Sequence, residues 1–571
     1  MHEHREAIRG DRRAVVRLVP TFLIICCLIA QATAAEPPVV IRDDDVEGAK
    51  LRLPNGDILK IYLDEDDMGG AIRSTDGGKT WTKPEKPVKR WATKTLLDRN
   101  GQMHGFFIIL RHVNEEGNRI AIDRFLDVWH VKTSGPDKVW EKGKIIQYGW
   151  NGSIVDDAIQ LPSGRIVQPS QDWVPGSRGE PPTGNGYAMT LYSDDGGQTW
   201  SRSNPITSPV YEGFNGANFG ACEPTIVLLN DGRLWMLMRT QTGYLYESFS
   251  EDGATWTEGR PSVFYASTGP PSLLRMPDNR LLLFWNNCEM PPRVNGQGVY
   301  AGRDALHAAI SEDDGKTWRG FREILLDPRR HQTPPERGDR GTAYPYAVVS
   351  ADGRYAEATS GQGGHRVVMR IDPDWLLEKE RYSDFSNGLE DWSVFKGFGP
   401  IKRWWRDRVP GPQLIADPSN PDAVVLHIRK PDDKDADGAV WNFPAGHQGR
   451  LTLRIMFREG HRDAAIALND RFFEPTDNNA DEKAIYGLMV PPSGRLADSS
   501  YTFPTDRWVQ LDLAWDDAEQ ACQVSVDGQT VATIQQKHPT IHGVSYLHLR
   551  STADQVDPAG FLIGSVHARV E

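Results

Sequence analysis

The stretch Ser311-Glu312-Asp313-Asp314-Gly315-Lys316-Thr317-Trp318 decides the fold, because close copies of it return along the chain. In such a stretch Asp accepts backbone N–H groups across a tight turn, Gly supplies a positive φ, and Trp packs beneath. A turn of this kind joins two antiparallel strands at the surface, so we expect it to be structural rather than catalytic. The copies are STDGGKTW at 74–81, SDDGGQTW at 193–200 and the shorter SEDGATW at 250–256.

The copies recur at a nearly constant interval. With a degraded version, SGPDKVW, that ends at Trp140, successive motif tryptophans are 59, 60, 56 and 62 residues apart, at positions 81, 140, 200, 256 and 318. Six hairpin signals, each a tight turn followed by an apolar run, start at Leu53, Asp98, Leu161, Leu229, Met276 and Ser350. Together they predict an all-β, six-bladed β-propeller over residues 36–375, with its last blade closed by strands from both ends of this segment.

The pattern changes after the predicted propeller. Residues 376–383 predict a short helix or linker, and residues 384–571 contain alternating strands without an Asp-box, such as LTLRIMFRE from Leu451 and CQVSVDGQTVATI from Cys522. This second region resembles a jelly-roll β-sandwich of concanavalin-like type. We expect it to pack against the propeller, with carbohydrate binding as the alternative role.

Residues 1–35 predict a signal peptide. An arginine-rich start precedes an apolar run at 19–29, and Ala32-Thr33-Ala34 offers a cleavage site. Because the apolar run is shorter than the roughly 20 residues of a membrane span, we expect an exported protein, periplasmic or secreted, with no span in the mature chain. The mature chain keeps Cys222, Cys288 and Cys522, which allow at most one disulfide.

Composition excludes several partner classes. The net charge of −13 argues against nucleic acid and anionic membrane surfaces as partners. No metal or other cofactor is expected: the mature chain has neither closely spaced Cys pairs nor an EF-hand loop, and Pro539 interrupts the only His-x-x-x-His spacing, His538 to His542. The sequence leaves the oligomeric state open.

Four residues fall where propeller loops converge at one end of the channel. Glu223, in ACEPTIVLL, begins the innermost strand of the fourth blade, and Arg239, in LWMLMRT, ends the next strand. Arg303, in AGRDALHAAIS, belongs to the fifth blade, and Tyr344, in GTAYPYAVV, opens the corresponding strand of the sixth. Each has a structural alternative: Glu223 could simply accept backbone N–H groups at a strand start, with Arg239 as its salt-bridge partner. Arg303 could pair only with Asp304 or the nearby turn, and Tyr344 could pack in the core.

This order of Asp-boxes, Glu, two Arg and Tyr resembles the sialidase (neuraminidase) superfamily over residues 51–372. The resemblance implies that Tyr344 is the nucleophile, that Glu223 is its base, and that Arg239 and Arg303 hold a sugar carboxylate. A free Tyr, with a pKa near 10, attacks poorly until a carboxylate takes its proton. A neutral nucleophile also suits an anomeric carbon that bears a carboxylate, and sialidases are an exception to the two-carboxylate scheme of glycosidases.

The first blade departs from the family pattern. Sialidases carry an Arg-Ile-Pro phrase there, whereas this chain has DDDVEGAKLRLPNG, and the expected arginine position falls near Val46. Arg42 or Arg52 could substitute for it, although neither is in register. For the general acid the nearest match is Asp67, with Asp66, Asp43, Asp44 and Asp45 as rivals.

Three functions remain open on the sequence. The first is an exo-glycosidase of sialidase type that releases a terminal acidic sugar from a glycan. The second is a propeller lyase or glycosidase acting on a uronic or other acidic sugar, for which His104, His112 and His130 are candidate groups although we expect them to be structural. The third is a non-catalytic glycan-binding protein. The loop YGWNGSIVDD, at 148–157, is expected to line the cleft in any of these.

Overall fold

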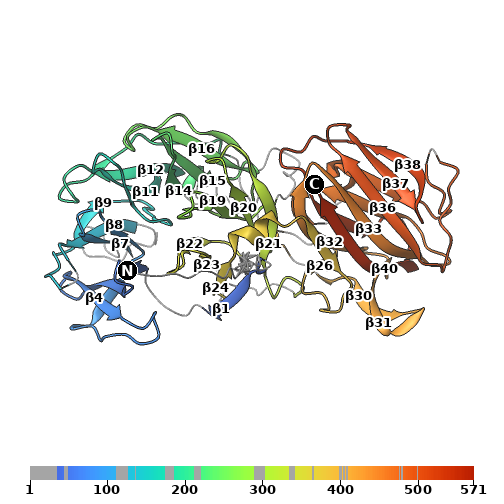
Figure 1. Cartoon of the computed structure of the whole chain (residues 1–571), viewed down its shortest axis with the longest axis horizontal. Coiled ribbons are helices and arrows are strands. Elements are labelled where there is room, and N and C mark those ends of the chain that lie inside the picture. Colours follow the sequence, from blue (N-terminus) through green and yellow to red (C-terminus); the bar gives the residue numbers. More distant parts are fainter. Residues whose placement is uncertain are drawn as a thin grey trace, which may run out of the picture. The chain divides into compact units, whose positions relative to one another are not determined.

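The computed structural model shows an all-β chain (Figure 1). It describes residues 35–43, 49–110, 126–135, 137–173, 186–210, 220–288, 302–332, 341–362, 365–397, 401–402, 405–406, 409–474, 476, 480–497 and 499–571. Within these ranges the helices are a 3₁₀ helix, η2 (Pro373–Leu377), and one turn of α-helix, α1 (Ala480–Lys483). Neither is long and apolar enough to cross a membrane. The predicted signal peptide lies outside the described residues, and Glu36–Glu571 forms one compact unit.

Six antiparallel sheets of four strands follow one another along the described part of the chain. The first contains β2 (Lys50–Arg52), β3 (Ile58–Asp64), β4 (Gly69–Ser74) and β5 (Val88–Trp91), and the second contains β6 (Lys94–Leu97), β7 (Met103–Leu110), β8 (Leu126–Thr133) and β9 (Lys144–Gln147). The third contains β10 (Ile159–Gln160), β11 (Ile166–Trp173), β12 (Gly186–Ser193) and β13 (Ser201–Arg202), and the fourth contains β14 (Cys222–Leu228), β15 (Leu234–Arg239), β16 (Tyr244–Ser250) and β17 (Arg260–Tyr265). The fifth contains β18 (Ser272–Arg275), β19 (Leu281–Trp285), β20 (Ala305–Ser311) and β21 (Arg319–Leu326).

The sixth sheet combines both ends of the segment 36–375. Its order is β1 (Val39–Asp43), β24 (Val367–Ile371), β23 (Ala356–Ser360) and β22 (Tyr346–Val349). Strand β1 runs antiparallel to β24, with Val39 opposite Arg370 and Arg42 opposite Val368. The expected use of an N-terminal strand to complete the last sheet of the series is therefore confirmed.

The Asp-boxes lie in the turns that follow the third strand of a sheet. In the first of them, Asp76 accepts the backbone N–H of Thr80 at 2.9 Å, Ser74 Oγ accepts the N–H of Gly78 at 2.8 Å, and Trp81 Nε1 donates to the Gly78 carbonyl at 3.1 Å. Gly78 has a φ of +91°. The boxes at Asp195 and Asp313 repeat the Asp-to-Thr bond. The motif is thus a turn clasp, as its composition predicts.

Apolar side chains join consecutive sheets. Leu63 and Phe107 belong to one cluster across the first and second sheets, and Phe106 and Ile166 to another across the second and third. Further clusters connect the third sheet to the fourth and the fourth to the fifth, and β18 contacts β22 of the sixth. Consecutive sheets are therefore held face to face by shared cores, which fixes the strand ends that carry the site.

The C-terminal region contains two larger sheets that share one core of buried residues. In one, β30 (Gln413–Asp417), β31 (Asn420–Lys430), β40 (Asp557–Val570), β33 (Gln448–Phe457), β36 (Val509–Asp516), β37 (Ala521–Val526) and β38 (Gln529–Gln535) lie in that order, and β25 (Glu380–Ser383) also pairs with β40. In the other, the order is β29 (Val409–Pro410), β26 (Trp392–Lys396), β32 (Asp437–Gly446), β39 (Val544–Ser551), β34 (Ala464–Asn469) and β35 (Tyr486–Val490). The two-residue strands β27 (Ile401–Lys402) and β28 (Trp405–Arg406) form a separate pair. Part of the stretch expected to be a linker, 376–383, is thus strand β25.

Polar contacts bind the C-terminal region to the fifth sheet. Asn442 Oδ1 accepts the backbone N–H of Glu323 at 2.9 Å, and its Nδ2 donates to the Phe321 carbonyl at 3.1 Å. Tyr546 Oη donates to Glu323 Oε1 at 2.7 Å, and Asn287 Nδ2 donates to the Asp470 carbonyl at 3.1 Å. Because buried polar groups are costly when unpaired, these contacts make the region a packing partner of the fifth sheet.

Candidate functional site

Tyr344 and Glu223 meet from two sheets that are far apart in the chain. Tyr344 precedes β22, and Glu223 is the second residue of β14. The Tyr344 hydroxyl donates to Glu223 Oε1 at 3.1 Å. A phenol that donates to a carboxylate at this distance is poised to lose its proton to it. The convergence expected of these two residues is present in the structure.

Arg239 joins both residues. It ends β15, opposite Cys222 in the ladder, and its side chain is only 2% exposed. Its Nη1 donates to Glu223 Oε2 at 2.6 Å and to Tyr344 Oη at 3.3 Å. The guanidinium therefore neutralises the carboxylate and also touches the phenol oxygen, where negative charge would develop if Tyr344 lost its proton.

Arg303 lies beside the ring of Tyr344. Its guanidinium carbon is 5.4 Å from the ring centroid, and the side chain is 2% exposed. Its Nη1 donates to Gln362 Oε1 at 3.1 Å and its Nη2 to the Thr268 carbonyl at 2.6 Å. These bonds orient Arg303, so both arginines that the sequence selects are fixed at the site.

Electrostatics keep Tyr344 protonated. Burial, and after it the negative charge of Glu223, raise the pKa of Tyr344 above its ordinary value of 10, whereas Arg239 and Arg303 act in the opposite direction. The phenol is thus a proton donor at neutral pH. Glu223, which already accepts its hydrogen bond, is the group placed to take the proton.

Glu223 and Tyr344 share an unusual backbone conformation. Their φ angles are +48° and +60°, in a region that costs an L-residue roughly 1–2 kcal/mol. Each precedes a proline and lies three residues after a glycine with positive φ, Gly220 and Gly341. A Cβ on Gly341 would lie 2.3 Å from the Arg303 carbonyl oxygen, so only glycine fits there. Strained residues of this kind cluster at functional sites.

The two remaining candidates, Asp67 and Arg42, lie at the first sheet and in the sixth sheet. Asp67 occupies the turn between β3 and β4, with a φ of +63°. Its carboxylate forms an ion pair with Lys89, whose Nζ lies 2.5 Å from Asp67 Oδ1. Arg42 lies in β1, and its side chain is not described. Arg52 is an exposed residue at the end of β2. The position near Val46, together with Asp44 and Asp45, falls outside the described residues.

A cavity of about 670 Å³ opens beside Tyr344. Residues of β5 and β6 line one side, residues of the sixth sheet line the other, and Ile154 and Val155, from the loop expected to line the cleft, also contribute. Sequence analysis missed Lys94 and Tyr346 in this lining. Tyr346 could have been found, because it is only two residues after Tyr344 and begins strand β22. Lys94 has no such local signal.

The histidines of the second sheet are buried away from this cavity. His104 Nδ1 and His130 Nε2 are 3.0 Å apart, both side chains are fully buried, and the His130 ring contacts Trp200 of an Asp-box. Burial lowers the pKa of His104 to about 4. His112 lies outside the described residues. Among the residues that the structure describes, no group of three His, Cys, Asp or Glu side chains is placed to hold a metal, and Cys222, Cys288 and Cys522 form no disulfide.

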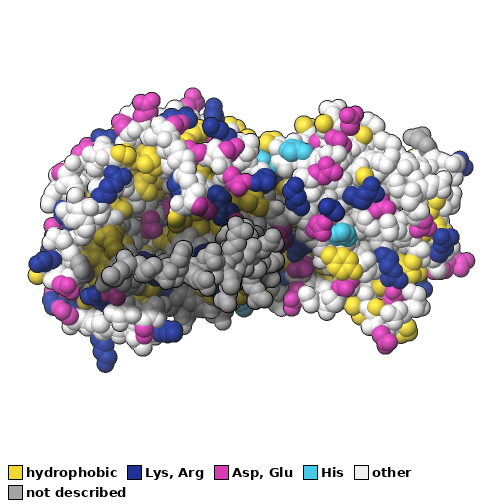
Figure 2. All heavy atoms as spheres, in the orientation of Figure 1, with side chains coloured by type: hydrophobic (Ala, Val, Ile, Leu, Met, Phe, Trp, Pro, Cys, Tyr) yellow, Lys and Arg dark blue, Asp and Glu magenta, His cyan; other side chains and the backbone are white. Residues whose placement is uncertain are grey.

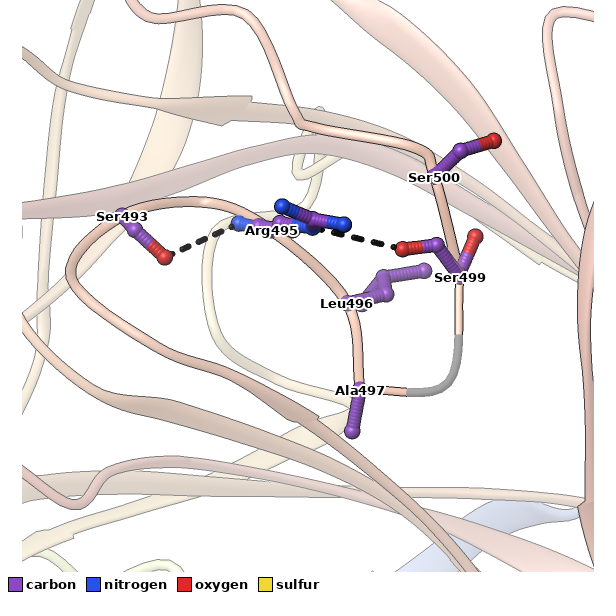
Figure 3. Close-up of a pocket in the computed structure, with 6 residues that line it drawn as sticks. All are labelled: Ser493, Arg495, Leu496, Ala497, Ser499 and Ser500. Carbon is purple, nitrogen blue, oxygen red and sulfur yellow. Dashed lines mark hydrogen bonds between the residues drawn. The ribbon is translucent and has the colours of Figure 1, made fainter.

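A second hollow, of about 540 Å³, lies in the C-terminal region (Figure 3). One loop forms it, and of its described lining residues, which lie at 493–497 and 499–500, only Arg495 is charged. Arg495 donates to Ser493 Oγ from its backbone at 3.3 Å and to the Ser499 carbonyl from Nε at 3.4 Å. The side chain thus stabilises its own loop.

Comparison with known proteins agrees with the motif and the fold. The family model described as "BNR repeat-like domain" matches residues 89–356, and the model "BNR/Asp-box repeat" matches residues 72–83. These matches identify Asp-box (BNR) repeats within residues 72–356. No curated protein matches the sequence.

Solved structures give distant similarities. The Trypanosoma rangeli sialidase is 13% identical, with 94% of this chain and 95% of that chain covered and a TM-score of 0.38. The same sialidase in complex with 2,3-difluorosialic acid, described as a covalent intermediate, is also 13% identical. That comparison covers 94% of this chain and 91% of the sialidase chain, with a TM-score of 0.36. A protein of unknown function from Dyadobacter fermentans DSM 18053 is 18% identical, covers 59% of this chain and 98% of its own, and has a TM-score of 0.41.

Proposed function

We propose that this protein is an exported exo-glycosidase of sialidase type, which hydrolyses a terminal acidic sugar, of the sialic acid type, from glycans. The observation that carries the proposal is the contact of the Tyr344 hydroxyl with Glu223, with Arg239 bonded to both. In this proposal the six small sheets are the blades of a propeller, and the two larger sheets form a concanavalin-like sandwich. Residues 1–35 are a signal peptide.

Each residue has a stated role in the proposed reaction. Glu223 takes the phenol proton while Tyr344 Oη forms a bond to the anomeric carbon, and the bond from that carbon to the leaving oxygen breaks. An acid, for which Asp67 is the candidate, gives a proton to the leaving oxygen. Water then attacks the anomeric carbon and gives one proton back to the carboxylate of the acid, while the bond from that carbon to Tyr344 Oη breaks and Tyr344 regains its proton from Glu223. Arg239 and Arg303 bind the sugar carboxylate, which Arg can grip with two N–H groups.

Cleavage of a fluorogenic sialoside tests the proposal. Wild-type protein should release the fluorophore, and Tyr344→Phe and Glu223→Gln should each lower kcat by about 10²–10⁴, the range of a general base or of its nucleophile. Tyr382→Phe is the matched control, because it removes the hydroxyl of a tyrosine that is 58% exposed on β25. Absence of turnover by the wild type, or full activity of Tyr344→Phe, would refute the assignment.

A second function keeps the same site but changes the sugar. The sequence has no arginine in register with the first-blade position of the family pattern, near Val46, and Arg239 and Arg303 already donate to Glu223, Gln362 and the Thr268 carbonyl. This favours, as the alternative, a lyase or glycosidase for a uronic acid, or a glycan-binding protein without catalysis. Ultraviolet absorbance of an unsaturated uronate would identify the lyase, and glycan binding without turnover the lectin.

A further inference from the structure

The cavity beside Tyr344 carries an excess of positive charge. Its lining includes five cationic residues and one acidic residue, namely Lys50, Lys89, Arg90, Lys94, Arg366 and Glu357. The whole chain has a net charge of −13, and acidic and basic side chains are interspersed over the face shown in Figure 2. A concave site lined by one sign of charge attracts ligands of the opposite sign. The cavity is thus suited to an anion.

Lys94 is the buried member of this set. It begins β6, is 5% exposed, and its ammonium lies 3.3 Å from the ring centroid of Tyr346. The Tyr346 hydroxyl donates to Asp157 Oδ2 at 2.5 Å, and Asp157 Oδ1 accepts the backbone N–H of Thr95 at 3.0 Å. The ring is therefore fixed by its own hydrogen bond, and the nearest carboxylate is engaged by these two groups.

The Lys94 ammonium forms no ion pair at hydrogen-bonding distance with the neighbouring carboxylates that the structure describes. Asp156, the other neighbouring carboxylate, bonds to Thr225 Oγ1 and to the N–H of Asp157, and both carboxylates act on Lys94 only through longer-range attraction. Burial lowers the pKa of Lys94 to about 8. A buried charge is costly unless it is paired, so an oxyanion that entered the cavity would gain a charge-assisted hydrogen bond.

We propose that this cavity binds a second acidic group of the glycan, a carboxylate or sulfate on the sugar next to the one held at Tyr344, with Lys94 as its principal ligand. Tyr344 and Lys94 line the same cavity, and we therefore assign the second acidic group to the sugar next to the one held at Tyr344. The substrate class is then a glycan with acidic groups on neighbouring residues. This part of the inference rests on the proposed function, whereas the anion site itself does not.

Calorimetry with the Tyr344→Phe protein tests the subsite without turnover. The probes are sialyllactose, whose second sugar is neutral, disialyllactose, whose second sugar has a carboxylate, and a sialyllactose sulfated on its second sugar. We expect the two diacidic probes to bind at least tenfold more tightly than sialyllactose, and Lys94→Gln to remove this difference without weakening sialyllactose binding. A preference for only one diacidic probe would assign the group as carboxylate or sulfate. Equal affinity for all three probes would overturn the subsite.

Inorganic sulfate separates failure of the subsite from failure of the proposed function. At constant ionic strength, sulfate should raise the Tm of the wild-type protein more than chloride does, and Lys94→Gln should lose that increment. Lys83→Gln, an exposed residue outside the cavity, is the control of equal charge change and should keep it. If Lys94→Gln is too unstable to measure, Arg90→Gln, on the exposed rim of β5, should halve the increment or more. Equal sulfate responses in all variants would exclude the anion site even if sialosides are cleaved.

Discussion

Glu223, the second residue of β14, and Tyr344, two residues before β22, are 121 residues apart, have φ angles of +48° and +60°, and join through one hydrogen bond of 3.1 Å. Two non-glycine residues in this conformation at one contact indicate that the surrounding structure imposes the geometry. In each case a proline follows, which disfavours the right-handed helical region for the residue before it. Backbone strain at Glu223 lowers the free energy of unfolding, whereas the ion pair with Arg239 raises it. Separate measurements can resolve the two effects.

Because of the backbone strain at Glu223, we expect a glycine variant at this position to be more stable than an alanine variant, the reverse of the usual order. Both Glu223→Gly and Glu223→Ala remove the carboxylate, but only glycine adopts a positive φ without cost. We expect the glycine variant to have a free energy of unfolding about 1 kcal/mol higher than the alanine variant. Urea denaturation of both proteins measures the difference. At Glu247, within β16, the order should be the usual one, with alanine the more stable.

The ion pair between Glu223 and Arg239 should be strongly coupled. Both side chains are largely buried, at 12% and 2% exposure, so loss of one partner leaves a buried charge. We expect Glu223→Gln to cost about 3–5 kcal/mol of stability, and a double-mutant cycle with Arg239→Met to show a coupling of about 1–3 kcal/mol. The exposed pair Arg507–Asp527 is the control, with coupling below about 1 kcal/mol. Additive effects at Glu223 and Arg239 would show that the pair is not formed in solution.

Glu323 predicts a pH dependence at the contact with the C-terminal region. Burial raises the pKa of Glu323 to about 7 from 4.5, although Tyr546 donates a hydrogen bond to it. Between pH 4.5 and 7 the unfolded chain releases this proton while the folded chain keeps it, so stability falls as pH rises through that window. Glu323→Gln should therefore match the wild type near pH 4.5 and exceed it by about 1–3 kcal/mol at pH 8. Equal stability of the two proteins at pH 8, or an identical gain from the exposed control Glu519→Gln, would contradict this account.

The Asp-box turn at Gly197 should tolerate no side chain. Gly197 and Gly232 both have positive φ, +82° and +90°, but a Cβ on Gly197 would lie 2.9 Å from His130 Cε1, whereas one on Gly232 would meet open space. We expect Gly232→Ala to cost about 1 kcal/mol, for backbone strain alone, and Gly197→Ala about 1–3 kcal/mol more. Thermal denaturation compares them. Equal losses would mean that the buried histidine pair can move to accept the methyl group.

Local patterns predicted the repeating sheets and four residues of the site. The Asp-box closes its turn with its own side chains, so the spacing of the copies along the chain predicts where successive sheets lie. This holds even for the degraded copy that ends in the buried Trp140. Glu223, Arg239, Arg303 and Tyr344 were found because each lies at a strand end whose position the repeat determines. Export, the individual catalytic roles and the domain boundaries stay predictions.

What escaped prediction depends on contacts between distant segments. Lys94 is a single lysine at a strand start. Its role in the cavity depends on Tyr346, which belongs to the sixth sheet, and on Asp157, which lies in a loop before the third sheet. Strand β25 was expected to be part of a linker, because its sequence ERYS is short and charged and it becomes a strand only by pairing with β40. The ion pair of Asp67 with Lys89 also depends on a contact between separate segments. Strand β5 pairs with β3, and the repeated motif did not predict this pairing.

Strand β1 has a consequence for the order of events during synthesis. It precedes the other described strands in the chain, yet the Asp372 side chain that accepts the Glu36 N–H lies 336 residues after Glu36, directly after the partner strand β24. At about 5–20 residues per second, the sixth sheet lacks its last strand for roughly 17–70 s. The first five sheets can form vectorially in that interval, whereas the strand end that positions Tyr344 matures only after translation has passed β24.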